Sequence, residues 1–545
     1  MARRPGSMVG SVGCTFVGVV VRPGDRLGEY DRMRDVGATP EPVGAAAPVG
    51  EAGAVAADGR RRFVVQWHRA RRTHADLRLE HDGVLLSWAV PKGPTLRPKV
   101  RRLAVRTEDH PFAYRWFEGV IPAGYGKGDV IVWDDGWWEP DAEHGRAVGI
   151  DAALAAGTLK FTLHGARLRG SFVLVATGDD QWLLTKRDDE HADGRWTMDE
   201  PPRSAFSLRS NDHVKAGEPP RWEAPTGHEL AALDAIRGAG TWAVGGRSLP
   251  LTNLDKVLLP GREDSAETGV DHAAPVTKRD LVRYLATMAP VLAPYLMARP
   301  VNLTRYPDGP AGESFWQKAV PKHAPEWLRR WPDPDARPGR TREYLVVNGA
   351  PALAWVANAA AIEIHPWTST AMTPKEPSYA LVDIDPGPAT EWDDTVLLAR
   401  QFRAALDHLG LVARAKVTGK RGIQIWIPVR RGYSFDETQG FVERLSRAVG
   451  ASVPGLVSWK WRTDERDGLA RLDYTQNQWN KTLVAPYSVR PAPGGTVSVP
   501  IEWAELDDPH LRPDRWTVRT TPDRVAEVGD PFAAIVGVEQ DLPAL

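Results

Sequence analysis

The hydrophobic pattern of this chain changes once along its length, and that change constrains the fold more than any single motif. From Phe63 onwards, short alternating runs such as LKFTLHG and SFVLVAT lie between turns rich in Gly, Pro and Asp. A period of two residues predicts half-buried strands, and many short strands predict an antiparallel sandwich or barrel. Beyond about residue 246 the pattern becomes mixed, with helical patterns at 278–296 and 392–409 and strand patterns at 379–384, 423–428 and 470–474. We therefore expect a multidomain chain, an N-terminal β-domain followed by an α/β (α+β) domain.

The composition excludes several classes of protein. Hydrophobic residues make up 42% of the 545 residues and charged residues 26%, which excludes a disordered or fibrous chain. The single cysteine, Cys14, excludes a disulfide scaffold and a cysteine-rich zinc site, and it fits a reducing cytosol. The apolar stretch 9–21 is too short and too rich in glycine to span a membrane, and it lacks a signal-peptide cleavage motif. We expect a disordered leader over residues 1–26 and no membrane partner.

Charge is unevenly distributed, although the net charge is only −1. Residues 60–106 hold thirteen Lys or Arg and three Asp or Glu. A local excess of this kind favours phosphate-bearing partners, and a solvated basic face is the alternative.

The segment QWHRARRTHADLRLEHDG carries the first group of reactive side chains. If a strand starts at Thr73, alternation puts His74, Asp76, Arg78 and Glu80 on one face. His68 would lie about 20 Å from His74 along a straight strand at ~3.3 Å per residue, so the two meet only if the residues between them form a turn. Two imidazoles and a carboxylate suit a first-row divalent ion, whereas a solvated strand face with incidental histidines is the alternative.

The run SYALVDIDPG carries the second group. Asp383 and Asp385 stand at positions i and i+2 of an expected strand, just before a Pro-Gly break. Adjacent carboxylates raise each other's pKa unless a cation lies between them, so paired acids at a strand end are typical of a Mg²⁺ or Mn²⁺ site for nucleotide phosphates. Asp473 could supply a third carboxylate from a neighbouring strand. The alternative is a turn that happens to be acidic.

The first segment belongs to a longer run, from FVVQWHRARRTHADLRLEHDG to GYGKGDVIVWDDG, that resembles the 3′-phosphoesterase module of bacterial DNA ligase D. The resemblance covers about residues 27–217. It implies a Mn²⁺-dependent β-barrel that trims 3′-ribonucleotides and 3′-phosphates from DNA ends. It assigns metal binding to His68, His74 and Asp76, phosphate binding and catalysis to Arg78, Arg102, His110 and Tyr114, and functional arm positions to Arg34, Asp35 and Glu41.

The remainder of the chain, 247–545, resembles the polymerase module of ligase D, an archaeo-eukaryotic primase-type fold. Matching stretches include LTNLDKVLLP, SFWQKAVPKHAPEW, LVDIDPG and LDYTQNQWNKTLVAPYSVRP. The resemblance assigns catalytic Mn²⁺ or Mg²⁺ binding to Asp383, Asp385 and Asp473, the 5′-phosphate of a broken end to Lys256 and Lys278, and template stacking to Phe315 and Trp316. It assigns the nucleotide pocket to His365, Thr418, Arg421, Gln424, Gln476 and Arg490.

One position departs from the ligase D pattern. The family strand S-G-x-K-G-L-H is T-G-K-R-G-I-Q here, so Gln424 replaces a histidine. Glutamine forms hydrogen bonds but cannot become cationic, and a charge-assisted bond to phosphate is roughly twice as strong as a neutral one. We expect weaker nucleotide binding.

The resemblance implies DNA-end processing in bacterial non-homologous end joining, by a 3′-phosphoesterase and a primase-type polymerase joined through a linker at 218–246. No K-x-D-G motif occurs, so the chain lacks the adenylated lysine of DNA ligases. The implied partners are DNA ends, nucleoside triphosphates, Ku and a separate ATP-dependent ligase, and the implied location is the cytoplasmic nucleoid. The alternative is a DNA-end-binding scaffold with a degenerate polymerase site that recruits the ligase.

Overall fold

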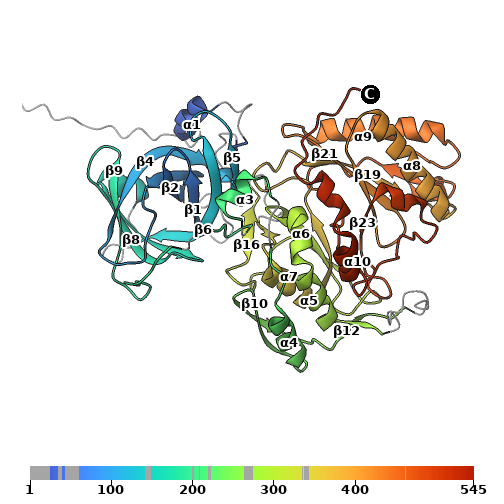
Figure 1. Ribbon diagram of the computed structural model, residues 1–545, viewed down its shortest axis with the longest axis horizontal. Coiled ribbons are helices and arrows are strands. Elements are labelled where there is room, and N and C mark those ends of the chain that lie inside the picture. The colour runs from blue at the N-terminus through green and yellow to red at the C-terminus, as the bar shows by residue number, and fades with distance from the viewer. Residues whose placement is uncertain are drawn as a thin grey trace, which may run out of the picture.

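The computed structural model consists of two units that lie side by side, a barrel at the N-terminal end and a larger α+β unit at the C-terminal end (Figure 1). None of the described helices is long and apolar enough to cross a membrane. The structure describes residues 25–34, 40–42, 60–141, 149–198, 202–207, 209–218, 222–262, 274–333, 336, 343–460 and 462–545.

The first unit is a closed antiparallel barrel. Its strand order is β1-β2-β3-β4-β9-β8-β7-β6, and β1 pairs with β6 to close the ring, while β5 lies outside it on β6. The expected N-terminal β-barrel is therefore confirmed. The strands are β1 (Arg61–Arg69), β2 (Thr73–His81), β3 (Val84–Val90), β4 (Arg101–Pro111), β5 (Gly119–Ile121), β6 (Gly128–Pro140), β7 (Thr158–Gly165), β8 (Arg169–Ala176) and β9 (Gln181–Lys186).

Alternation along β2 separates the barrel core from the polar face. Ala75, Leu77 and Leu79 belong to the core inside the barrel, together with large rings such as Trp88 and Phe161. The residues between them face the other way, toward the short helices of this unit. The helices on this face are η1 (Asp25–Leu27), α1 (Gly28–Met33) and η2 (Phe112–Trp116). The helices α2 (Ile150–Ala155) and α3 (Asn211–Lys215) lie elsewhere on the barrel.

The second unit contains two antiparallel sheets. In the first, β14 (Pro300–Arg305) is central and pairs with β15 (Phe315–Gln317), β17 (Glu343–Val346) and β18 (Ala361–Pro366), and β16 (Arg329–Pro332) pairs with β17. The second has the order β22-β19-β21-β20-β23, formed by β22 (Arg471–Asp473), β19 (Tyr379–Asp385), β21 (Ile423–Pro428), β20 (Arg414–Val417) and β23 (Pro500–Ile501). Two hairpins flank them, β10 (Gly240–Val244) with β11 (Arg247–Leu251) and β12 (Val257–Leu259) with β13 (Val276–Thr277).

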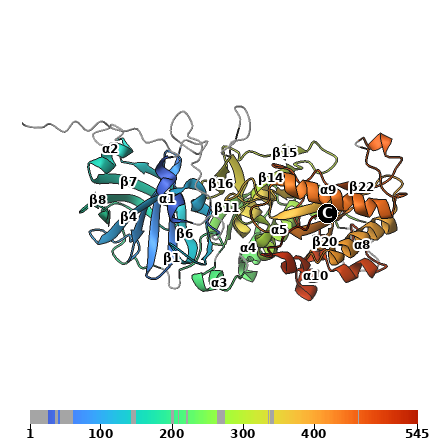
Figure 2. The ribbon, with the colours of Figure 1, turned by 90° about the horizontal axis from the view of Figure 1, so that it is seen from above.

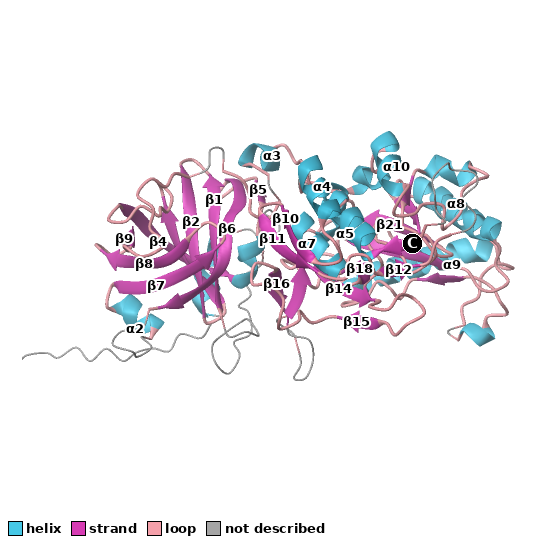
Figure 3. Ribbon diagram, turned by 90° about the horizontal axis from the view of Figure 1, so that it is seen from below, coloured by secondary structure: helices cyan, strands magenta, loops and turns pink. Residues whose placement is uncertain are grey.

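Most of the described helices belong to the second unit, as Figure 3 shows. They are α4 (Gly227–Ala235), α5 (Lys278–Thr287), α6 (Ala289–Leu296), α7 (Ala350–Asn358), α8 (Trp392–His408), α9 (Phe435–Ser452) and α10 (Thr521–Val528), with short turns η4 (Thr463–Glu465), η5 (Trp503–Asp507) and η6 (Pro531–Ile535). The single helix expected over 278–296 is two helices that meet at Met288. Pro290 explains the break, because proline has no N–H to continue the hydrogen-bond ladder of α5.

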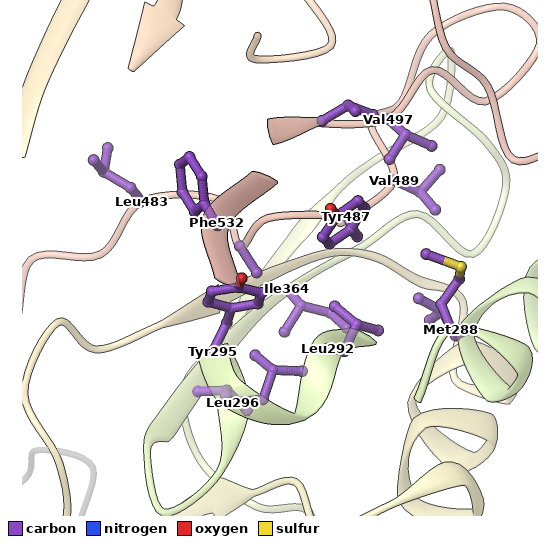
Figure 4. Close-up of a cluster of buried hydrophobic side chains, with 14 of the residues drawn as sticks. Met288, Leu292, Tyr295, Leu296, Ile364, Leu483, Tyr487, Val489, Val497 and Phe532 are labelled. Carbon is purple, nitrogen blue, oxygen red and sulfur yellow. The ribbon is translucent and has the colours of Figure 1, made fainter. Parts of the chain in front are cut away.

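The core of the second unit joins helices to chain segments that are distant in sequence. Met288, Leu292 and Tyr295 pack against Tyr487 and Phe532, from the C-terminal part of the chain (Figure 4). The Tyr295 and Phe532 rings lie 6.1 Å apart, edge to face. One core of buried residues thus extends across both sheets.

The segment expected to be an interdomain linker, 218–246, is folded where it is described. It forms α4 and β10, and Trp222, Leu233 and Trp242 are buried in the core of the second unit. The glycines that favoured a linker occupy turns instead: Gly238 and Gly245 have positive φ angles of 62° and 52°. The flexible composition therefore reflects tight turns between anchored aromatic residues.

The two units share a hydrophobic cluster, so the linker expected between them is not their only connection. Trp116 and Phe206 of the first unit pack in one cluster with Trp331, Tyr344 and Trp367 of the second. In Figures 1 and 2, β6 and β16 lie next to each other at this junction. A buried apolar contact between two units favours a fixed relative position over independent motion.

Candidate active sites

The two histidines and the aspartate of the first motif converge on one site. The β1–β2 hairpin pairs His68 with His74, because Arg69 pairs with Thr73 and the residues between them form the turn. His68 Nδ1 lies 3.7 Å from Asp76 Oδ2, and His74 Nε2 lies 3.4 Å from Asp76 Oδ1. One ligand atom from each residue lies within 4.8 Å of the others.

The protonation of this group fits a bound divalent cation. His68 Nε2 donates to the Gly126 carbonyl and His74 Nδ1 donates to the Arg72 carbonyl, each at 2.8 Å. A carbonyl can only accept, so in the neutral form of each ring the nitrogen that faces Asp76 carries a lone pair. Backbone carbonyls that orient the second ring nitrogen are typical of metal-binding histidines. The donor set suits a first-row ion such as Mn²⁺.

Arg78 is fixed beside the candidate metal ligands. Its guanidinium donates to Asp76 at 3.0 Å, to Gln66 at 2.7 Å and to Ser87 at 2.9 Å, and it lies over the Tyr114 ring. Burial would raise the pKa of Asp76, but the charge of Arg78 holds that pKa well below its usual range. Asp76 is therefore ionised, as a metal ligand must be.

His110 is a buried neutral imidazole in the same site. Its Nδ1 donates to the Glu108 carbonyl at 2.9 Å, and its Nε2 accepts from Arg34 at 3.2 Å. Burial lowers the pKa of His110 well below its usual value, and the charges of Arg78 and Arg34 lower it further. A proton-free Nε2 can take up a proton during a reaction.

The N-terminal arm reaches this site. Arg34 forms ion pairs with Glu41 at 2.9 Å and with Glu108 at 3.0 Å, and the Tyr114 hydroxyl donates to Glu41 at 2.9 Å. Asp35 lies outside the described residues. The sequence analysis missed Gln66 and Glu108, although each stands two residues before a predicted histidine on the same strand face.

Arg102 is not brought to this cluster. It lines a separate hollow with Lys92, Arg97 and Trp196, and it shares a face of β4 with Ala104, which belongs to the barrel core. Alternation alone would put Arg102 and His110 on one face of β4, but the register shift in the β3–β4 pairing between Leu85 and Ser87 separates them. Its part in the phosphoesterase remains a prediction.

In the second unit, strand pairing aligns the three aspartates. Asp383 of β19 is the direct partner of Asp473 on β22 and of Gln424 on β21, and Asp385 lies two residues further along β19. Burial raises the pKa of Asp383 to about 8, with a contribution from the charge of Asp385, and burial also raises the pKa of Asp385. The described ligand atoms of the three carboxylates do not approach one another as closely as those of the histidine cluster. Raised pKa values show that the carboxylates repel each other, which a cation between them would relieve.

Asp473 and Gln424 are tied to their surroundings. Burial would raise the pKa of Asp473, but hydrogen bonds from Thr475 and Gln476 hold it below its usual value. Gln424 Nε2 donates to Asp383 Oδ1 at 3.0 Å, and its Oε1 is buried without a partner among the described residues.

Two of the predicted nucleotide-pocket residues, His365 and Arg490, contact a carboxylate that the sequence patterns did not identify, Glu363. Arg490 donates to it at 2.9 Å, the Tyr306 hydroxyl donates to it at 3.1 Å, and Lys420 lies 3.5 Å away. His365 at 3.8 Å and the charges of Arg490 and Lys420 hold the pKa of Glu363 far below its usual value despite burial. Glu363 stands two residues before His365 on β18, a spacing that could have identified it.

The remaining pocket positions lie along the same edge. Arg490 Nη1 donates to the Thr418 carbonyl at 2.8 Å, and the Thr418 hydroxyl accepts from the Gly422 amide at 3.0 Å. Gln476 donates to Asp473 at 3.0 Å, and Arg421 is exposed. Of the nucleotide candidates, Gln476 and Gln424 thus contact the aspartates directly.

Lys256 and Lys278 are neighbours despite their distance in sequence. The β12–β13 hairpin joins them, and the Lys278 amide donates to the Lys256 carbonyl at 2.9 Å. Burial lowers the pKa of Lys278, and the charges of Lys256 and Arg305 lower it further. Three cations therefore meet there, of which Arg305 escaped the sequence analysis.

Phe315 and Trp316 form an exposed aromatic pair on β15. They are 47% and 48% exposed, although large apolar side chains are usually buried. The Trp316 ring lies 4.8 Å from the His365 ring, so the pair borders the nucleotide-pocket candidates.

Two family models match the chain. Residues 66–176 match the DNA ligase D 3′-phosphoesterase domain, and residues 277–532 match the LigD primase-polymerase domain. Together they cover both units described above.

Several curated proteins are similar to the chain. A multifunctional non-homologous end joining protein LigD of Pseudomonas aeruginosa is 24% identical over 95% of this chain and 98% of that protein. A bifunctional LigD of Bacillus subtilis is 29% identical over 54% of this chain and 45% of that protein. A multifunctional LigD of Mycobacterium tuberculosis is 46% identical over 29% of this chain, but the match spans only 19% of that protein.

Among solved structures, the polymerase domain of Mycobacterium tuberculosis ligase D in complex with DNA is 30% identical. The match covers 54% of this chain and 99% of that one, with a TM-score of 0.47.

Proposed function

This chain belongs to the LigD family, combining a 3′-phosphoesterase domain with a primase-polymerase domain, and on that premise we propose that it processes DNA ends for bacterial end joining. The first unit trims 3′-phosphates and 3′-ribonucleotides, and the second adds nucleotides at gaps or templated ends. Ku and a separate ATP-dependent ligase, acting at the nucleoid, complete the repair. The observation that carries the proposal is the His68, His74 and Asp76 group, with both lone pairs directed at one carboxylate.

In the phosphoesterase site, a divalent ion held by these three residues would polarise a phosphate oxygen. Arg78, fixed by Asp76, Gln66 and Ser87, binds a second oxygen of the same phosphate. His110 takes or returns a proton at Nε2.

In the polymerase site, Asp383, Asp385 and Asp473 would hold Mn²⁺ or Mg²⁺, which supplies charge neutralisation on the triphosphate. Arg490 and Lys420 face the phosphates, and Glu363 keeps both cations in place until a nucleotide arrives. Phe315 and Trp316 stack on template bases, which aromatic rings do without sequence preference. Lys256 and Lys278 hold the 5′-phosphate.

The test is a trimming assay of the full chain with Mn²⁺ and a duplex that ends in a 3′-phosphate or a single 3′-ribonucleotide. We expect His74→Ala to lose trimming by at least about 100-fold, the scale on which loss of a metal ligand or its support acts, while the fold persists. His228→Ala, an exposed histidine of α4, is the matched control and should trim normally. Trimming that survives His74→Ala, or that a chelator leaves unchanged, would overturn the assignment.

A second candidate function rests on one contact. The side-chain amide of Gln424 donates a hydrogen bond to Asp383, and the family pattern has a histidine at the position of Gln424. A polymerase site closed in this way would suit a scaffold that binds DNA ends and recruits the ligase. Extension of a gapped, 5′-phosphorylated duplex by the wild-type chain would exclude that scaffold.

A further inference from the structure

A cleft of about 430 Å³ lies where the two units meet, apart from both candidate active sites. Its walls come from β1, β6, η2 and the β7–β8 turn of the barrel, and from β11, β16 and the segment before β16 in the second unit. None of the residues assigned above to metal, nucleotide or 5′-phosphate binding lines it. The function proposed above leaves it unexplained.

Arginine dominates both walls of this cleft. The barrel contributes Arg60, Arg62, Arg115 and Arg169, and the second unit contributes Arg247, Arg329 and Arg330. Asp135 is shared by Arg115 at 3.4 Å and Arg329 at 2.9 Å, Glu326 pairs with Arg60, and Glu343 pairs with Arg62 and Arg330. Seven guanidinium groups therefore face three carboxylates among the described residues.

Two of these arginines are buried with donors that nothing described accepts. Arg115 is 3% exposed and Arg329 is 8% exposed. In each, the Nε and Nη1 nitrogens have no hydrogen-bond partner among the described residues. A buried donor without a partner costs about 1–3 kcal/mol, and more when it is charged. These donor atoms are themselves shielded from solvent, so an acceptor in the cleft meets the more exposed Arg169 and Arg247 first.

The arginines also repel one another. Burial lowers the pKa of Arg115 to about 10, and the charges of Arg62 and Arg329 contribute to that shift although Asp135 opposes it. Burial lowers the pKa of Arg247 as well, with contributions from Arg169 and Arg329 across the cleft. The repulsion crosses the junction, and an anion bound between the two walls would relieve it.

We propose that this cleft binds the phosphate backbone of a single DNA strand that passes between the two units. The guanidinium fork matches phosphate oxygens two at a time, and several forks in one groove suit a chain of phosphates. Arg60 lies over Trp137 at 4.5 Å and Arg247 over Trp327 at 5.5 Å, and arginines interleaved with aromatic rings are typical of single-strand grooves. That the polyanion is DNA, and not another phosphate polymer, rests on the proposed end-processing function.

The test measures binding of a fluorescent oligothymidylate to the full chain by anisotropy, as a function of salt concentration. The variant Arg169→Gln/Arg247→Gln removes one cation from each wall and leaves the buried ion pairs intact. Each lost phosphate contact on a single strand reduces the slope of log K against log salt by about 0.7. We expect the slope to fall by about 1.4 and affinity at low salt to fall about tenfold.

Three further arms make the result decisive. Arg195→Gln/Arg444→Gln removes exposed arginines outside the cleft, one from each unit, and should bind like wild type. Arg169→Lys/Arg247→Lys keeps the charges and should retain most of the salt slope. Inorganic phosphate or a nucleoside triphosphate should compete only at concentrations far above those of the oligonucleotide, because each offers fewer contacts.

An unchanged slope in the glutamine variant, an equal loss in the control variant, or equal competition by free triphosphate would overturn the proposal. Trimming and extension, measured on the same preparations, separate it from the proposed function. A wild-type chain that neither trims nor extends, but binds the strand through these arginines, would refute the function and sustain the cleft.

Discussion

Gln424 shows how much one side chain can decide. Its amide donates to Asp383, and its own carbonyl oxygen is buried without a described partner. A buried oxygen without a partner costs free energy. The hydrogen bond of Gln424 to Asp383 therefore forms at the expense of hydrogen bonding by the amide oxygen of Gln424. In the proposed polymerase, this residue sits between the metal ligand and the incoming nucleotide.

A change of Gln424 to His should strengthen nucleotide binding. A charged hydrogen bond exceeds a neutral one by about 1 kcal/mol, which corresponds to about fivefold in affinity. We expect Gln424→His to lower the KM for the nucleotide about fivefold in extension of a gapped duplex. If neither form extends at millimolar nucleotide with Mn²⁺, the scaffold function is favoured instead.

Removing one carboxylate should separate the two activities. Asp473→Asn retains the shape of the side chain but removes a charge from the polymerase site, which lies in a different unit from the histidine cluster. We expect extension to fall by at least about 100-fold and 3′-trimming to remain within twofold of wild type. Parallel loss of both activities would show that the substitution unfolds the chain or that the sites are not separate.

Glu80 should make the stability of the chain depend on pH. Burial raises its pKa from the usual 4.5 to about 7, so the folded chain holds a proton that the unfolded chain has already released. Stability is then highest below about pH 4.5, falls as pH rises to about 7 and is constant above, a loss of about 3 kcal/mol at 1.36 kcal/mol per unit.

Thermal melts between pH 5 and pH 8 measure this effect. Glu80→Gln, which cannot ionise, should lose that share of the pH dependence. Glu527→Gln, exposed on α10, should retain it. Identical pH profiles for Glu80→Gln and wild type would contradict the assignment.

At the scale of elements, the periodicity of hydrophobic residues predicted a helix or strand best where the segment also contains the residues that end it. The strand patterns at 379–384 and 423–428 correspond to β19 and β21, and Trp392–His408 forms α8. The turn that the sequence required between His68 and His74, if the two were to meet, is the turn of the β1–β2 hairpin. Arg305 was missed, because its importance comes from Lys256 and Lys278 on other elements, and periodicity shows only the faces of its own strand.

The β12–β13 hairpin carries the prediction for this scale. It sets Lys256 and Lys278 side by side at the start of α5, and Asp308 and the Asn358 carbonyl hold their ammonium groups. We expect Lys278→Ala to reduce the preference for a 5′-phosphorylated gap over an unphosphorylated one about tenfold, since a hydrogen bond to a charged group contributes about 1.5–3 kcal/mol. Lys215→Ala, exposed on α3, is the control. Equal use of both gaps by wild type would contradict the assignment.

For the whole molecule, the sequence predicted two units but not how they join. The pattern of a strand shows which face is buried, and it does not show whether the cover belongs to the same unit. Trp331 and Trp116 were therefore indistinguishable from ordinary core residues, and the Gly-rich segment near residue 240 resembled a linker although its tryptophans are buried.

Two fragments test where the second unit begins. Fragment 219–545 retains Trp222, Leu233 and Trp242, and fragment 247–545 lacks them. Each buried large side chain that is lost costs about 2–5 kcal/mol, so the shorter fragment should melt well below the longer one or fail to fold. Both fragments lack the whole barrel, so they differ only in residues 219–246. Equal melting temperatures would restore 218–246 as a linker.

The cluster shared between the units also bears on how such a chain can change by recombination. Trp331 packs with residues of its own sheet and with Phe206 and Trp116 of the barrel. If either unit were exchanged for that of a distant homologue, its junction residues would not match those of the other unit. Inheritance therefore favours transfer of the two enzymes as one block, and substitutions at this junction must suit both at once.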